Sequence, residues 1–340
     1  MKNVTKIVIL TMYAALSLSS CRKVHITPEE TKTPLGFTAV SQTAVVDAKT
    51  KALTDYTGSG FGVWGIARHP ASENYTLWNN TGFMYASKNA SGYYAPEEVA
   101  YWIGGYTYRF FACAPYDNGS DMSLTDFTVV PETANTKDAV SFKYDMSNKA
   151  YDYDLLGAAA ETAVTVGATQ GSQQLVFWHL LSKINITISF VDIVDASGAP
   201  TNVVNVSEIR LKEVDTKVSY TLSLDSNNQL SVAVEDDGSD NDEVEIVFPS
   251  GSGEINVAPQ DVSDVVLELD FTIGEGVYAI QTTGYQVLMG SVHESLGISP
   301  VYINNQQYNW NITISPKYII FKPTVQKWGD GGSVNGSIEM

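Results

Sequence analysis

Cysteine is scarce in this sequence, and its scarcity excludes one way of holding a fold together. The 340 residues contain only Cys21 and Cys113, which is too few for a disulfide framework. Cys113 follows Phe110-Phe111-Ala112, and an unpaired cysteine in such an aromatic stretch usually serves as a small buried hydrophobic residue. The fold is therefore expected to depend on packing alone.

Motifs of catalytic and metal sites are also missing. The four histidines share no metal-ligand spacing with one another or with a cysteine; they are His25, His69, His179 and His293. The sequence has no G-x-S-x-G elbow, no P-loop and no glycine-rich dinucleotide turn. We therefore expect a protein that is not an enzyme, with no catalytic, cofactor-binding or metal residues. A secreted hydrolase ranks last among the alternatives, since no pair of carboxylates is indicated.

Long apolar runs are absent after the first residues. Ile7–Leu18 is an apolar run of about a dozen residues, shorter than the ~20 of a transmembrane helix. It ends at Leu18-Ser19-Ser20-Cys21, which has the spacing of a bacterial lipoprotein processing site. We expect a signal peptide over residues 1–20, cleavage between Ser20 and Cys21, and lipid attachment at Cys21. The alternative is an ordinary signal peptide that ends near a cysteine.

Positive charge is in short supply as well. The chain has 20 basic and 38 acidic residues, a formal net charge of −18, and loss of residues 1–20 with their two lysines leaves −20. A surface of this sign repels the phosphates of nucleic acids, so a nucleic-acid partner is not expected.

Short β-strand patterns fill the rest of the chain. After a tether over residues 21–34, we expect an N-terminal β-sandwich domain over residues 35–170 and a C-terminal one over residues 171–340. Many short alternating segments, without an amphipathic helix of three turns, are typical of antiparallel sandwiches. The fold class predicted is all-β, with two tandem antiparallel β-sandwich domains.

Two hairpins are predicted in the C-terminal half. The first joins Val206–Val214 to Val218–Leu224, and the second joins Val265–Ile273 to Val277–Thr282. Residues 235–245 are strongly acidic and are interpreted as a solvated hairpin tip. Calcium binding is the alternative, but the order of ligands does not match an EF-hand loop.

The first strand of the ordered part is unusual in having no charge. Leu35–Val46 is rich in threonine, valine and alanine, and its imperfect alternation indicates a strand covered on both faces. A short polar connector, Asp47–Ala52, follows it and contains Lys49 and Lys51. The six tryptophans and 19 tyrosines are assigned mainly to cores, with a carbohydrate groove as the alternative.

Several segments, taken in order after Cys21, resemble the fimbrillin family of Bacteroidales, the lipoprotein pilins of type V pili. They are Phe61-Gly62-Val63-Trp64-Gly65, Tyr106-Thr107-Tyr108-Arg109-Phe110-Phe111-Ala112, Asp154-Leu155-Leu156-Gly157, His179-Leu180-Leu181-Ser182-Lys183-Ile184, Trp310-Asn311-Ile312-Thr313-Ile314 and Val325-Gln326-Lys327-Trp328. The resemblance covers nearly the whole chain after the signal peptide.

The resemblance implies two transthyretin-like sandwich domains and a way of assembly. Subunits reach the cell outer membrane as lipid-anchored precursors, and a trypsin-like protease cuts after a basic residue between the first two strands. The lost strand leaves a groove that a strand of the next subunit fills. Other fimbrial subunits are thus the implied partners, in a homo- or hetero-polymer, and a cell-surface fimbrium that supports adhesion is the implied location.

The sequence departs from the family pattern at the cut. Many members have arginine there, whereas this connector offers only Lys49 and Lys51, which are the candidate maturation sites. An uncut anchor subunit therefore stays open as an alternative. So do a tip adhesin and a non-polymerising surface lipoprotein, either of which would bind glycan or protein on a host or bacterial surface.

Overall fold

The computed structural model describes most of the chain after residue 32. The described residues are 33–42, 53–71, 74–78, 81–116, 124–133, 136–147, 153–190, 204–236, 243–248, 253–274, 279–315, 319–328, 333–335 and 338–339. Nearly all regular structure in them is β, as predicted, and α2 (Met289–Ser295) is a helix of only two turns. No helix among these residues is long and apolar enough to cross a membrane.

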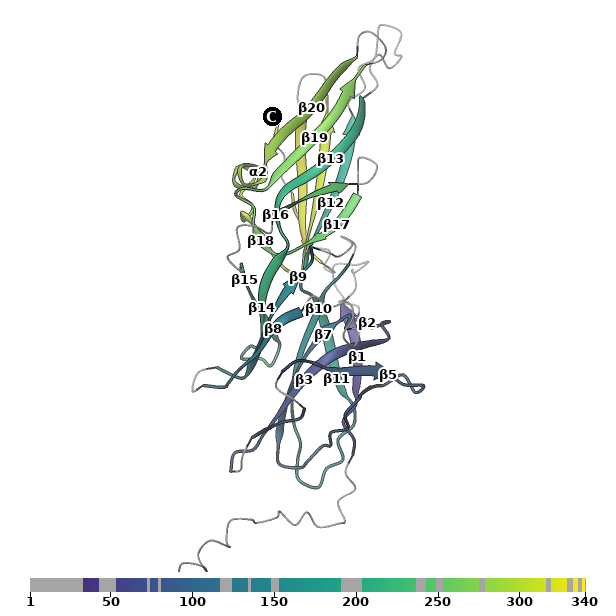
Figure 1. Ribbon diagram of the computed structural model, residues 1–340, viewed down its shortest axis with the longest axis vertical. Coiled ribbons are helices and arrows are strands. Elements are labelled where there is room, and N and C mark those ends of the chain that lie inside the picture. Colours follow the sequence, from purple (N-terminus) through teal and green to yellow (C-terminus); the bar gives the residue numbers. More distant parts are fainter. Residues whose placement is uncertain are drawn as a thin grey trace, which may run out of the picture. The chain divides into compact units, whose positions relative to one another are not determined.

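Seven strands close into a barrel. In order around it they are β1 (Phe37–Gln42), β11 (Gln173–His179), β10 (Leu156–Ala163), β7 (Thr107–Ala114), β3 (Gly60–Arg68), β5 (Met84–Lys88) and β6 (Tyr94–Pro96). Figure 1 labels β1, β3, β5, β7, β10 and β11 of this barrel. The barrel closes through β1, which pairs in parallel with β11 and antiparallel with β6. Two short strands, β2 (Leu53–Asp55) and β4 (Tyr75–Thr76), extend β1 and β3.

The barrel interior is filled by one aromatic core. Phe61 and Val63 of β3 face Phe110 of β7 and Phe177 of β11, and all four side chains are fully buried. Because successive side chains of a strand point to opposite faces, Trp64 and Phe111 are directed to the outside of the barrel. They are nevertheless buried, so a second layer covers this outer face.

That layer is a four-stranded sheet. Its order is β15 (Leu230–Asp236), β14 (Lys217–Leu224), β9 (Ala139–Asp145) and β8 (Leu124–Val130). The strict alternation of buried and half-buried residues in β14 places Val218, Tyr220 and Leu222 against the outer face of the barrel, in one core with Trp64 and Phe111. Cys113 lies in this core and is fully buried, as predicted.

The remaining strands form two larger sheets and a short pair. One sheet contains β17 (Gly253–Val257), β12 (Ser182–Phe190), β22 (Gln306–Ile314), β23 (Ile319–Lys327), β24 (Ser333–Asn335) and β25 (Ile338–Glu339). The other contains β16 (Glu243–Phe248), β13 (Val204–Asp215), β19 (Val266–Ile273) and β20 (Ile280–Leu288). The short pair is β18 (Gln260–Asp261) with β21 (Val301–Tyr302).

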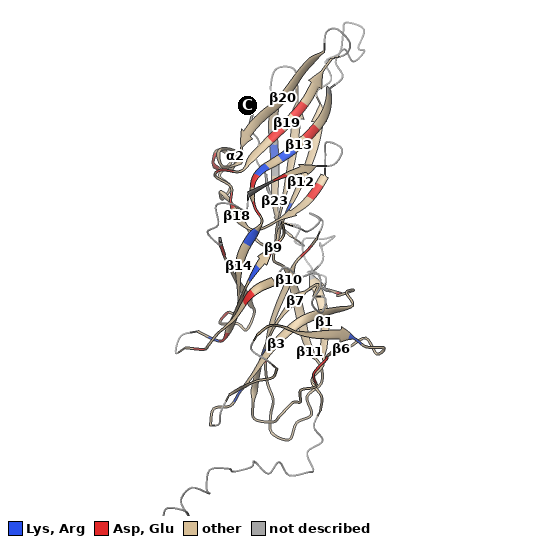
Figure 2. Ribbon diagram, viewed as in Figure 1, with Lys and Arg blue, Asp and Glu red and all other residues tan. Residues whose placement is uncertain are grey.

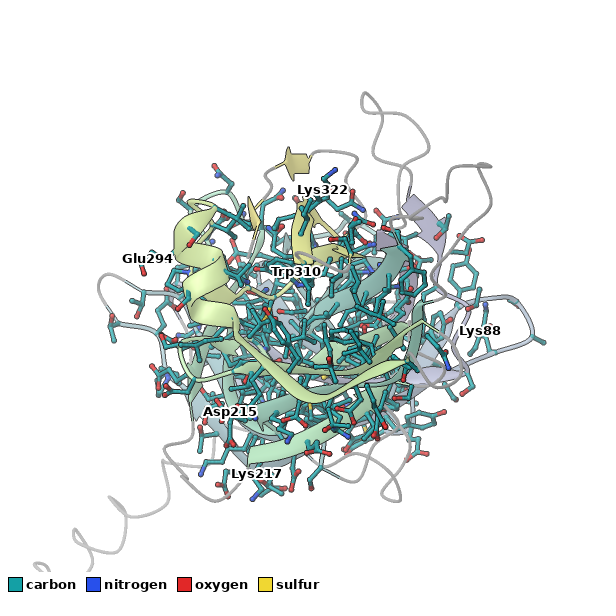
Figure 3. All side chains as sticks on the ribbon, turned by 90° about the horizontal axis from the view of Figure 1, so that it is seen from above. Lys88, Asp215, Lys217, Glu294, Trp310 and Lys322 are labelled. Carbon is teal, nitrogen blue, oxygen red and sulfur yellow. The ribbon has the colours of Figure 1, made fainter. Side chains whose placement is uncertain are left out.

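These two sheets share a core on their inner faces. Ile184 of β12 and Trp310 of β22 pack there with Leu211 of β13 and Leu267 of β19, and Trp310 lies among the interior side chains in Figure 3. β13 and β19 carry basic and acidic residues close together (Figure 2). Arg210 and Glu268 alternate with buried apolar residues of these strands, which places them on the outer faces. Arg210 of β13 pairs there with Glu268 and Asp270, each at 2.7 Å.

Two of the local predictions were wrong. β13 and β14 do not form a hairpin, because β13 pairs with β16 and β19 whereas β14 pairs with β9 and β15. The acidic segment at residues 235–245 is likewise not a hairpin tip, since the strands on its two sides belong to different sheets. The alternation of apolar and polar residues shows which face of a strand is buried, but it does not show which strand pairs with it. Both errors arose because neighbours in the sequence were assumed to pair.

Other predictions have different outcomes. The hairpin of Val265–Ile273 is confirmed in its antiparallel pairing of β19 with β20, but the second strand is Ile280–Leu288 and extends beyond the predicted end at Thr282. The sheets are not purely antiparallel, because β1–β11 and β12–β22 are parallel pairs. The transthyretin-like arrangement and the domain division at residue 170 stay predictions. Strands after residue 170 pair with strands before it: β11 pairs with β1 and β10 in the barrel, and β14 pairs with β9 in the covering sheet.

Candidate functional site

The candidate site is β1 and the slot that it occupies in the barrel wall. Its backbone is hydrogen-bonded on both sides. The amide of Gln173 in β11 donates to the carbonyl of Gly36 at 2.8 Å, and the amide of Tyr56 donates to the carbonyl of Ala39 at 3.0 Å. Just before the strand, the amide of Leu35 donates to the carbonyl of Ala100 at 2.8 Å. Loss of β1 would leave backbone groups on both neighbouring strands without partners.

The side chains of β1 alternate between the barrel interior and its outside. Leu35, Phe37 and Ala39 point inward and are 3%, 0% and 7% exposed. The ring of Phe37 meets Phe61 and Phe110 edge-on, with ring centroids 6.0 and 5.1 Å apart. The strand is thus an uncharged segment whose apolar side chains form part of the barrel core.

A tyrosine on the neighbouring strand braces the slot. Tyr94 of β6 pairs with Phe37 across the ladder, and its hydroxyl donates to the carbonyls of Tyr56 and Gly58 at 3.0 and 2.9 Å. Burial, with the nearby Asp55 carboxylate, raises the pKa of Tyr94, so the hydroxyl stays neutral. These bonds hold the chain after β2 against β6 independently of β1.

The connector between β1 and β2 closes a hairpin. Gln42, the last residue of β1, pairs with Leu53, the first residue of β2. Residues 43–52, which include Lys49 and Lys51, lie outside the described residues. Because the paired ends are in register, a cut in the connector would break only the covalent link and leave the ladder in place. Ser20 and Cys21 also lie outside the described residues, and the lipid site stays a prediction.

The C-terminal strand β23 belongs to the interior of its own sheet. It pairs along its whole length with β22 on one side and with β24 and β25 on the other. Its release would therefore require breaking two ladders, whereas β24 and β25 each form only one.

Sequence reasoning missed a buried ion cluster that ties the barrel to its covering sheet. Nη1 of Arg109 in β7 lies 2.8 Å from Oδ2 of Asp138, which directly precedes β9, and Nε of Arg109 lies 2.6 Å from Oε2 of Glu161 in β10. Arg68 at the end of β3 also bonds Asp138, and it lies 3.0 Å from Glu132. The Asp138 side chain is completely buried. Arg109 is the one charged residue of β7. A single charge in such a strand was the signal in the sequence that could have indicated a buried ion pair.

The charges in this cluster compensate one another. Burial acts to raise the pKa of Asp138, but hydrogen bonds from Arg68 and Arg109 outweigh it and hold that pKa below its usual range. Burial acts in the opposite direction on Arg109, and its bonds to Glu132 and Glu161 keep its pKa raised. Asp138 and Arg109 are thus held in their charged forms by each other and by their neighbours, and the cluster has a structural role.

The histidines in the described ranges do not form a metal centre. Nδ1 of His179 lies 2.7 Å from Oδ2 of Asp154, and the His179 ring stacks on Trp328 with centroids 3.8 Å apart. Its Nδ1 thus has a carboxylate partner and its ring an aromatic one. Within the described ranges, no group of three or more His, Cys, Asp and Glu residues could hold a metal ion. Residues 237–242 of the acidic segment are outside those ranges.

Comparison with solved structures finds similar chains in Bacteroidales. A "putative cell adhesion protein" of Bacteroides uniformis is 16% identical with a TM-score of 0.47, covering 87% of this chain and 99% of its own. A protein of the same description from Bacteroides ovatus is 13% identical, with a TM-score of 0.49 and coverage of 88% and 99%. A fimbrial assembly protein of Parabacteroides distasonis is 11% identical, with a TM-score of 0.44 and coverage of 90% and 100%.

Comparison with protein families gives a match over most of the chain. No curated protein matches the sequence. The model of a family described as fimbrillin-like matches residues 43–328, which begin directly after β1 and end at Trp328. This confirms the resemblance drawn from the sequence motifs, and the chain belongs to the fimbrillin-like family.

Proposed function

We propose that this chain is a structural subunit of a cell-surface fimbria, exported as a lipoprotein and assembled by exchange of β1 for a strand of the next subunit. The observation that carries the proposal is how β1 is held in the barrel. It is uncharged, paired on both edges, anchored by Phe37 inside the barrel, and joined to the rest by a connector with two lysines. Membership of the fimbrillin-like family supports a fimbrial role.

The proposed sequence of events starts at the outer membrane. A lipid on Cys21 holds the precursor there while β1 keeps the barrel closed. A protease that cuts after Lys49 or Lys51 then removes the covalent link, so that β1 can afterwards leave the barrel together with the lipid. The slot between β11 and β6 is left with apolar surface and unpaired backbone groups, and a strand from another subunit satisfies both at once.

The proposal includes the finer features predicted from the sequence. The barrel with its covering sheet and the two sheets around Trp310 would correspond to the two tandem transthyretin-like domains. Among the alternative roles, an anchor subunit is the one that a specific observation favours, because the connector lacks arginine. An anchor subunit would keep both β1 and its lipid.

Limited proteolysis of the purified precursor tests the exchange. We expect a trypsin-like protease to produce a ladder of polymers that survives mild SDS, because each filled slot buries a full set of backbone hydrogen bonds. The double variant Lys49→Ala/Lys51→Ala should stay monomeric under the same digestion. Lys88→Ala, which removes an exposed lysine in β5, should polymerise like the unmodified protein.

Two results would count against strand exchange triggered at the connector. One is a ladder formed equally well by the double variant. The other is an unmodified precursor that is cut after Lys49 or Lys51 and yet stays monomeric.

A further inference from the structure

Trp178 differs from the other tryptophans in its environment. Trp64, Trp78, Trp102, Trp310 and Trp328 are at most 9% exposed and belong to cores, as predicted for the aromatic residues. Trp178 is half-buried, and it lines an open groove on the outside of the barrel.

The position of the groove follows from how the covering sheet ends. In β11, Leu175 and Phe177 are buried in the barrel core, so Gln174, Val176 and Trp178 point outward. The covering sheet lies over β3, β7 and β10, and the turn between β14 and β15 marks its limit. The groove lies between this turn on one side and the outward side chains of β10 and β11 on the other.

The groove has the size and composition of a small-molecule site. Its volume is about 410 Å³, at the lower end of the range for ligand sites of about 300–1,000 Å³. Its lining is part apolar and part polar. The apolar part is Trp178 with Ala159, Ala160, Val176 and Leu230, and the polar part is Glu161, Gln173, Gln174, Asn228 and Gln229. The amide of Gln173 is hydrogen-bonded to Thr162 and to the backbone of Gln174. Amides offer a donor and an acceptor side by side, which suits the neighbouring hydroxyls of a sugar, and an indole face suits its C–H face.

The charges around the groove favour a neutral ligand. Glu161 lies 2.6 Å from Nε of Arg109 and 3.2 Å from Nζ of Lys137. Lys137 also bonds the side chain of Asn228. Both cations are thus engaged by groups of the protein itself, and the chain as a whole is strongly acidic. A sulfated or carboxylated sugar would meet repulsion without a dedicated cation.

We propose that this groove binds a neutral saccharide, with Trp178 as the stacking platform and with the amides of Gln174 and Gln229 as hydrogen-bonding groups. The site would give the subunit an adhesive activity of its own. It lies on the closed barrel of the precursor, so it requires neither proteolysis nor polymerisation.

Binding of oligosaccharides to the purified, uncut precursor tests the site. The probe is an array of neutral hexose and N-acetylhexosamine oligosaccharides, with sulfated and sialylated ones for comparison, followed by titration of the best neutral binder. We expect Trp178→Ala to weaken that binding about tenfold, as loss of an aromatic contact worth about 1.4 kcal/mol would do. Ligand should also change the Trp fluorescence of the unmodified protein.

Substitutions of exposed groove residues test the same site if Trp178→Ala fails to fold. Gln174 and Gln229 are exposed, and Gln174→Ala and Gln229→Ala should each weaken binding about threefold with unchanged stability. Tyr93→Ala, which removes an exposed aromatic side chain of the turn before β6, should bind like the unmodified protein. The proposal is overturned if no neutral oligosaccharide binds, or if folded groove variants bind as well as the unmodified protein. Neither result would bear on strand exchange, which is read from polymer ladders.

Discussion

Asp138→Ala is expected to lower the free energy of unfolding by about 3–5 kcal/mol, the cost of removing one partner from a buried ion pair. The substitution leaves Arg109, whose side chain is 9% exposed, and Arg68 facing each other without the carboxylate between them. Glu132 and Glu161 still contact Arg109, but neither can replace the central position of Asp138. Urea denaturation followed by circular dichroism measures the change.

An exposed ion pair nearby provides the matched control. Lys143 of β9 lies 3.4 Å from Asp126 of β8, and their side chains are 42% and 67% exposed. Lys143→Ala should cost less than about 1 kcal/mol, because exposed pairs contribute little. Similar losses for Asp138→Ala and Lys143→Ala would contradict the structural role assigned to the buried cluster.

The pH dependence of the same variants follows from the direction of the pKa. The pKa of Asp138 is lower in the folded protein than its usual value, so its stabilisation is present above the unfolded pKa of about 3.9. It is lost as the pH falls through the folded value. The difference in stability between the unmodified protein and Asp138→Ala should therefore stay constant from about pH 5 to pH 8 and shrink below about pH 4.

Removal of β1 should have the largest effect of any change to the barrel. A chain that begins at Leu53 loses the buried side chains of Leu35 and Phe37, each contributing about 1.5–3 kcal/mol, together with both ladders. That is a large share of a typical domain stability of about 5–15 kcal/mol. We expect this chain to self-associate on refolding, measured by size-exclusion chromatography with light scattering.

A peptide supplied in trans should reverse that effect. The segment from Thr33 to Val46, added in molar excess during refolding, is expected to fill the slot and return the truncated chain to a monomer. The same peptide with Phe37→Asp should fail, because a carboxylate at that position would be buried among Phe61 and Phe110. Rescue by both peptides, or by neither, would contradict the assignment of β1 as a strand held by its apolar anchors.

Sequence patterns predicted the character of β1 better than its partners. A strand near Leu35–Val46 was predicted and is present, but its imperfect alternation was wrongly interpreted as cover on both faces. Phe37 and Ala39 are buried in the barrel, whereas Thr38 and Val40 on the outer face are only half-buried. The parallel pairing with β11, more than 130 residues later in the chain, left no local signal. β13 and β14 were paired wrongly for the same reason, since both alternate cleanly and each had an acceptable partner nearby.

The ion cluster and the groove were beyond sequence reasoning for a related cause. Arg109 lies in β7, Glu161 in β10 and Asp138 directly before β9, and only the barrel and its covering sheet bring them together. Trp178 looks like any other aromatic residue in an apolar segment. Its exposure depends on where the β14–β15 turn ends over β11, which is a property of packing between distant strands.

N-terminal sequencing of the protein sheared from cells in polymeric form tests the central claim most directly, because the proposed assembly requires the polypeptide to be cut between β1 and β2. The account predicts that polymerised subunits begin at Thr50 or Ala52, after Lys49 or Lys51. Polymerised subunits that retain a blocked N-terminus at Cys21 would contradict it.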